Sequence, residues 1–243
     1  MDILLDQNGL HFLLRWLHFL AGIAWIGILY YFNLVQTPFF GKADAAPAND
    51  PLKAVKGGMV RNVVPSALWW FRWGAMFTFL SGLGMIELSR RQGAPMSGPY
   101  MTLILTGGLM GTLMWFNVWF IIWPAQKVVI ASAEQVAAGG QPIAEAAARG
   151  KTAGMASRTN AMLSIPMLFF MGSASHLPQL VQSQNVGLYW GIALAIVLAC
   201  AWNGIAGTDA TRKPLKSVRG FITAGFVLTA VFFAVIRFTL GAS

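Results

Sequence analysis

The sequence predicts an all-α fold, a polytopic membrane helical bundle of about six transmembrane helices with both termini outside. Of the 243 residues, 56% are hydrophobic and 10% are charged, whereas an ordinary soluble domain has about 25% charged residues. The mean hydropathy is +0.61. Apolar residues also occur in runs of about 20, the length of a helix that crosses a bilayer. We expect residues 1–243 to form a single transmembrane domain.

Six apolar segments meet this length, and we expect each to be one membrane span. They lie at roughly 10–36, 66–88, 100–123, 159–180, 186–206 and 219–240. Turn-forming residues separate them: "TPFFGKADAAPANDP" follows the first segment, "QGAPMSGP" lies between the second and third, and "IAGTDATRKP" lies between the fifth and sixth.

The stretch at about 125–157, between the third and fourth segments, is polar and rich in alanine. We expect it to form an amphipathic cytoplasmic insert of one or two short helices on the membrane surface, broken at Gly139–Gly140.

Lysine and arginine are distributed unevenly over the predicted loops, and this distribution sets the orientation. The loops after the second and fourth segments hold Arg90 and Arg91. The loops after the first, third and fifth hold Lys42, Lys53, Lys56, Arg61, Lys127, Arg149, Lys151, Arg158, Arg212, Lys213, Lys216 and Arg219. Because basic residues gather in cytoplasmic loops, we expect a multi-pass protein of the bacterial inner membrane with both termini outside.

Composition also excludes several classes of function. The net charge of +9 follows from membrane topology, and no basic patch carries the motif or the interleaved aromatics of a nucleic-acid-binding protein. Cys200 is the single cysteine, which excludes a disulfide or a cysteine-based metal site within the chain. A covalently attached c-type heme is excluded as well, because there is no Cys-x-x-Cys-His motif.

The histidines carry the main functional hypothesis. In the predicted topology His18 and His176 lie in the same leaflet, and each has a glycine one turn deeper, Gly22 and Gly172. A glycine has no side chain, so these two positions leave room for a flat macrocycle held between two helices. Imidazole is a standard axial ligand of heme iron. We therefore predict a b-type heme with His18 and His176 as its metal ligands.

The first segment supplies further residues for this predicted heme site. Arg15, His18, Gly22 and Trp25, together with His11, share one helix face. Arg15 is the expected partner of a heme propionate, and Trp25 is expected to pack either on the porphyrin or in the core between helices. The alternative is that a histidine near a span end hydrogen-bonds a neighbouring helix or a headgroup, which fits His11 well. His11 and His18 share one helix face, so they cannot flank one iron from opposite sides.

A second polar set lies toward the cytoplasmic side and comprises Arg72, Asn117, Arg158 and Asn160. One interpretation is a pocket for a planar anionic substrate, because arginine forks and asparagine amides suit such anions. The other is positive-inside anchoring by the arginines and interhelical hydrogen bonding by the asparagines.

Four long motifs resemble the bacterial membrane-bound urate oxidases (urate hydroxylases). They are "RWLHFLAGIAWIG" with "YYFNL", "LWWFRWGAMFTFLSGLGMIEL" (68–88), "NVWFIIWPAQKVVI" (117–130) and "SRTNAMLSIPMLFFMGSASHLP" (157–178). The first motif is also similar to the heme-b membrane protoporphyrinogen oxidases. Members of the urate oxidase family usually carry a cytochrome c domain after the last span and a histidine near the start of span two, where this chain has "SALWWFRW".

The resemblance implies a membrane-embedded heme b protein that transfers electrons in urate oxidation, with a separate cytochrome c as the external acceptor. It leaves open whether the chain is itself a heme-dependent oxidoreductase. The alternatives are a non-catalytic membrane subunit that anchors a respiratory or other redox complex, and a small-molecule or copper permease. Besides the lipid bilayer, the expected partners are thus a cytochrome c or respiratory complex subunits, and no nucleic acid.

Overall fold

The computed structural model describes residues 6–182 and 186–241, which form helices and no strand. The predicted all-α fold is therefore confirmed. The elements are α1 (Gln7–Tyr30), η2 (Tyr31–Gln36), α2 (Thr37–Ala45), α3 (Pro51–Asn62), α4 (Val64–Arg91), α5 (Pro99–Phe116), η3 (Asn117–Ile122), α6 (Trp123–Ala137), α7 (Ala146–His176), η4 (Pro178–Leu180), α8 (Gly187–Ala206), η5 (Lys213–Lys216) and α9 (Val218–Leu240).

Two of these helices are long, and each contains one π-helical stretch. The residues of α1, η2 and α2 form one continuous helix of 39 residues, and so do those of α5, η3 and α6. In both, a proline, Pro38 or Pro124, follows the π-helical stretch by two residues. Proline has no N–H and crowds the carbonyl four residues earlier, so the wider π-helical turns lie where the regular hydrogen-bond ladder is interrupted.

Four helical stretches in the described residues are long and apolar enough to cross a membrane: Gln7–Ala45, Pro99–Ala137, Gly187–Ala206 and Val218–Leu240. They make the chain a helical membrane protein surrounded by a lipid bilayer. The second predicted span falls within α4, and the fourth, at 159–180, lies mostly in α7 but runs past its end at His176; the two helices have 28 and 31 residues. These helices are long enough but more polar, since α4 carries Arg72 and Glu87 and α7 begins in the alanine-rich stretch.

The alanine-rich stretch at 125–157 continues the long helices instead of forming separate short ones. The helix begun by α5 extends through α6 to Ala137, and α7 runs from Ala146 to His176. The chain does break at Gly139–Gly140 as expected, and Gly139 has a φ of +85°. Alanine has the highest helix propensity, so the spans extend until glycine ends them.

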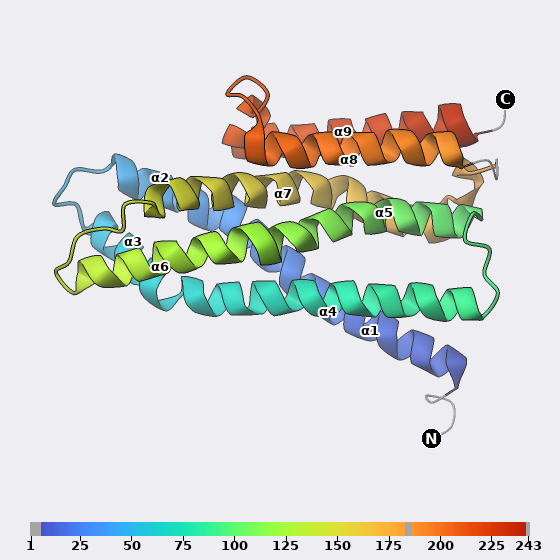
Figure 1. Cartoon of the computed structure of the whole chain (residues 1–243), viewed down its shortest axis with the longest axis horizontal. Helices are drawn as coiled ribbons and strands as arrows, with labels where there is room; N and C mark the ends of the chain where they lie inside the picture. The colour runs from blue at the N-terminus through green and yellow to red at the C-terminus, as the bar shows by residue number, and fades with distance from the viewer. Residues whose placement is uncertain (1–5, 183–185, 242–243) are drawn as a thin grey trace.

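Connections gather at two opposite ends of the bundle (Figure 1). The turns α2–α3, α6–α7 and α8–α9, which carry the basic residues, lie together at one end, called here the basic end. The start of α1, the α4–α5 turn and the end of α9 lie at the other end. Helix α1 packs chiefly on α4, and α5 packs chiefly on α7, which also contacts α9.

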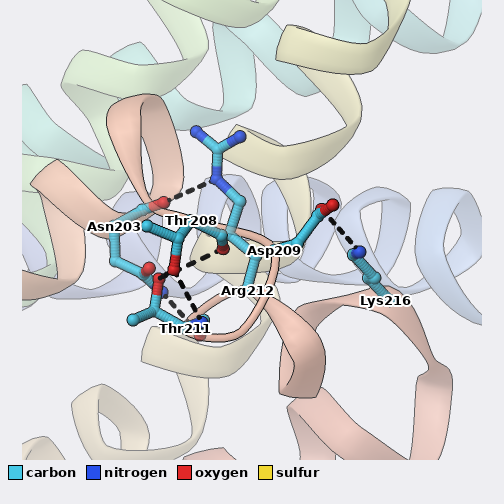
Figure 2. Close-up of polar contacts among 6 residues, drawn as sticks. All are labelled: Asn203, Thr208, Asp209, Thr211, Arg212 and Lys216. Atoms are coloured by element: carbon cyan, nitrogen blue, oxygen red, sulfur yellow. Dashed lines mark hydrogen bonds and ion pairs between the residues drawn. The ribbon is translucent and has the colours of Figure 1, made fainter.

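The α8–α9 connection at the basic end is held by its own side chains (Figure 2). Arg212 Nε donates to Asn203 O at 2.9 Å, which satisfies a carbonyl at the end of α8. Lys216 Nζ donates to Asp209 Oδ1 at 2.7 Å. This hydrogen bond and the charge of Lys216 hold the pKa of the Asp209 carboxyl below its usual range.

Candidate functional site

A cavity of about 1070 Å³ opens between the two helix pairs α1–α4 and α5–α7, in the half of the bundle away from the basic end. Its volume lies near the upper end of the range for cofactor pockets. All six residues predicted to bind the heme line this cavity, and so does His11. The six are Arg15, His18, Gly22, Trp25, Gly172 and His176.

Most of the cavity wall is apolar, and six of its lining residues are glycines. A Cβ added at Gly27, Gly108 or Gly172 would meet no atom within 4 Å. At these positions the helix backbone itself forms the wall, so a broad flat group can approach it closely. Trp25 is 2% exposed, and its buried Nε1 donor has no hydrogen-bond partner among the described residues.

Helix α4 positions His18 through Ser81. Ser81 Oγ lies 2.6 Å from Phe77 O and 3.1 Å from Thr78 O, so its one proton is donated to the backbone. It must then act as the acceptor toward His18 Nδ1, which lies 3.1 Å away. This places the proton of the neutral imidazole on Nδ1 and leaves the lone pair of Nε2 available to a metal.

A close helix crossing sets the register of this contact. A Cβ on Gly74 of α4 would lie 3.1 Å from Ala21 O and from Trp25 N, so glycine lets α1 and α4 approach at this point. His18 lies seven residues before Trp25 on α1, and Ser81 lies seven residues after Gly74 on α4. In antiparallel helices these steps bring the two side chains to the same level.

His11 makes a similar contact with a serine of α4, nearer the start of α1. Its Nε2 lies 3.3 Å from Ser89 Oγ of α4, which is the hydrogen bond to a neighbouring helix that the alternative interpretation described. Sequence reasoning missed Ser81 and Ser89. Ser81 and Ser89 are eight residues apart, and His18 and His11 are seven apart. These similar spacings could have indicated two serine–histidine contacts only if α1 and α4 were already known to be paired.

His176 and Arg15 reach the cavity from its outer part. His176 is the last residue of α7, Arg15 lies on α1, and both are exposed. Neither side chain hydrogen-bonds to another described residue. An exposed imidazole and a free guanidinium beside one cavity fit a heme, which needs an iron ligand and a partner for its carboxylates.

The second polar set does not line this cavity. Asn117 Nδ2 donates to Asn160 Oδ1 at 2.8 Å, and Asn160 Nδ2 donates to Met114 O at 2.9 Å, both within the buried interior. Arg158 Nη1 donates to Leu215 O at 2.9 Å. Asn117 and Asn160 thus make the hydrogen bonds between helices that the second interpretation described, and Arg158 joins α7 to the turn at Leu215. Arg72 lies apart from them, against tryptophan rings.

Among residues 6–182 and 186–241, no three side chains of His, Cys, Asp or Glu come together as a ligand set for a bare metal ion. His18 and His176, two of the three histidines that line the cavity, instead suit a metal that brings further ligands of its own, as heme iron does.

Comparison with known proteins gave one family. A family model described as "Urate oxidase N-terminal" matches residues 5–94 and 96–235. No curated protein and no solved structure matches the chain.

Proposed function

Because the chain belongs to the urate oxidase N-terminal family, we propose that it is a membrane-embedded heme b protein that transfers electrons during urate oxidation. The acceptor is a separate cytochrome c on the outer side of the bacterial inner membrane. The observation that carries this proposal is the cavity lined by His18 and His176 together.

Each cavity residue has a defined task in this proposal. His18 offers Nε2 to the iron, while its Nδ1 proton is held by Ser81 Oγ. His176 offers the second imidazole from α7, and Arg15 pairs with a propionate. The glycines leave room for the ring, and Trp25 forms part of the cavity wall. When bound, a heme b supplies a one-electron redox centre whose potential depends on its axial ligands and burial.

The proposed topology has six spans, with α4 and α7 as the second and fourth. A helix rises about 1.5 Å per residue, so either one is long enough to cross the hydrocarbon core of about 30 Å. The basic end then faces the cytoplasm and the cavity lies in the outer half of the membrane. This supports electron delivery to a cytochrome c outside, because the heme edge and its acceptor lie on the same side.

Absorption spectroscopy on the protein purified in detergent tests the proposal. We expect reduced-minus-oxidised spectra with sharp b-type bands that are lost in His18→Ala and retained in the matched control His11→Ala. Added urate should then reduce the heme of the wild-type protein under anaerobic conditions.

Two results would contradict the proposal in different ways. A colourless protein after expression with ample heme removes the cofactor and favours a subunit or carrier. A heme protein that urate does not reduce, while a chemical reductant does, keeps the cofactor and favours a non-catalytic membrane subunit.

A further inference from the structure

Arg72 lies on α4 against three tryptophan rings, that of Trp73 on α4 itself and those of Trp119 in η3 and Trp123 in α6. Its guanidinium carbon is 4.0 Å from the ring centroid of Trp123, 5.2 Å from that of Trp119 and 5.8 Å from that of Trp73. The faces of indole rings attract a cation, and guanidinium stacks well on them. The rings therefore hold the arginine in place, but they do not neutralise its charge.

A second cation lies over one of these rings. Lys127 Nζ is 5.8 Å from the centroid of Trp123, so Arg72 and Lys127 are separated by no more than the sum of their distances to that ring. Among the described residues, no carboxylate forms a salt bridge with either of them. Two neighbouring cations without a counter-charge repel each other and attract an anion.

Two hydrogen-bond donors in the same cluster also lack partners. Arg72 Nε and Trp119 Nε1 are buried, and neither has an acceptor in the described part of the chain. Buried N–H groups are almost always paired in native proteins, so an unpaired group calls for an unseen partner. Both groups are hydrogen-bond donors that lack an acceptor, and an anion with several acceptor oxygens would supply one.

The cluster lies toward the basic end, where α4 and α6 run alongside each other (Figure 1). Arg72 is eight residues from the first residue of α4, or about 12 Å along the helix. Trp69 and Trp70, one turn nearer that end, are 48% and 57% exposed. Exposed indoles are typical of the headgroup level of a membrane, and a long arginine side chain reaches that level from inside the span.

We propose that Arg72, Lys127 and the rings of Trp119 and Trp123 form a binding site for the phosphate of an anionic phospholipid in the cytoplasmic leaflet. The phosphate oxygens accept hydrogen bonds from the guanidinium and the ammonium. The acyl chains extend from the phosphate toward the bilayer centre, and the exposed indoles of Trp69 and Trp70 lie at the headgroup level beside it. A lipid fits better than a soluble anion because the cations adjoin exposed apolar surface, not an enclosed pocket.

Native mass spectrometry of the full chain in detergent tests this site, with phosphatidylglycerol and phosphatidylcholine of identical acyl chains as probes. We expect phosphatidylglycerol to bind about 25-fold more tightly, since each of the two cations near an anionic headgroup contributes about a fivefold preference. The variant Arg72→Gln/Lys127→Gln should lose this preference. The matched control Lys53→Gln/Lys151→Gln removes the same charge from exposed positions and should keep it.

Further arms separate the alternatives. If the double variant does not fold, as judged by circular dichroism, Lys127→Gln alone replaces an exposed residue and should reduce the preference about threefold to fivefold. Equal binding of the two lipids by the wild type, or an equal loss in the control, overturns the proposal. Displacement of phosphatidylglycerol by millimolar inorganic phosphate or by urate also overturns it, in favour of a soluble-anion or substrate site.

Discussion

At the scale of single residues, the hydroxyl of Ser81 decides the chemistry available to His18. A histidine on an apolar helix has two tautomers, and a serine that donates its proton to the backbone selects one of them. The tautomer of His18 cannot be predicted from His18 or its neighbours on α1. The serine lies 63 positions away in the chain, and only the crossing of α1 and α4 brings the two together.

Replacement of Ser81 tests this role. We expect Ser81→Ala to weaken heme binding by about tenfold to a hundredfold, because groups that orient a metal-bound histidine contribute on this scale. Titration of the apoprotein with heme, followed by its absorption, measures the change. Ser89→Ala removes the corresponding partner of His11 and should leave heme affinity unchanged. Equal effects of the two variants would show that neither serine acts through His18.

At the scale of helices, glycine has two distinct uses in this bundle. Gly74 permits two helices to touch, since a Cβ there would collide with backbone atoms of Ala21 and Trp25. Gly172 leaves open space, since a Cβ there meets nothing. The sequence shows the same residue in both places, and the difference lies in what the opposite helix presents.

Leucine at the two positions should therefore have opposite consequences. Gly172→Leu fills the cavity from α7 and is expected to abolish heme incorporation without lowering the melting temperature of the heme-free protein. Gly74→Leu pushes α1 from α4 and should destabilise the fold by about 1–3 kcal/mol, the usual cost of overpacking. Thermal unfolding and heme content, measured on both variants, check this. A Gly172→Leu protein that still binds heme at wild-type level would place the heme elsewhere.

Buried asparagines of the two π-helical stretches also connect helices of the bundle. Asn117 lies in the π-helical stretch η3 and binds Asn160 of α7, and Asn33 in the π-helical stretch η2 likewise donates to Ser157 of α7 at 2.8 Å. Each π-helical stretch thus directs one amide toward the same central helix. Hydrogen bonds of this kind between membrane helices contribute about 0.6–2 kcal/mol each, so they favour one packing of the bundle over alternatives.

At the scale of the whole molecule, the two ends of the bundle differ in charge and in function. Basic residues occupy the connections at one end, and the cavity opens in the other half. A membrane protein is inserted with its basic loops toward the cytoplasm. The proposed orientation rests on this asymmetry, and it places the cavity in the outer half of the membrane.

Reporter fusions test this orientation. Alkaline phosphatase fused after Ser243 should be active, because it folds outside the cytoplasm, and green fluorescent protein at the same position should be dark. Fusion of either reporter within the α6–α7 turn should give the reverse pattern. A fluorescent protein at the C-terminus would contradict the orientation and would move the cavity to the cytoplasmic half.

By itself, the sequence determined the helical class, the membrane environment and the glycine break between α6 and α7, because composition, hydropathy and helix propensity are local properties. Spacing along single helices also singled out the residues that line the cavity. The tertiary structure alone decided that Asn117 binds Asn160 and that Ser81 meets His18. These outcomes depend on which helices touch and in what register, and register is set by close contacts such as the one at Gly74, between residues far apart in the chain.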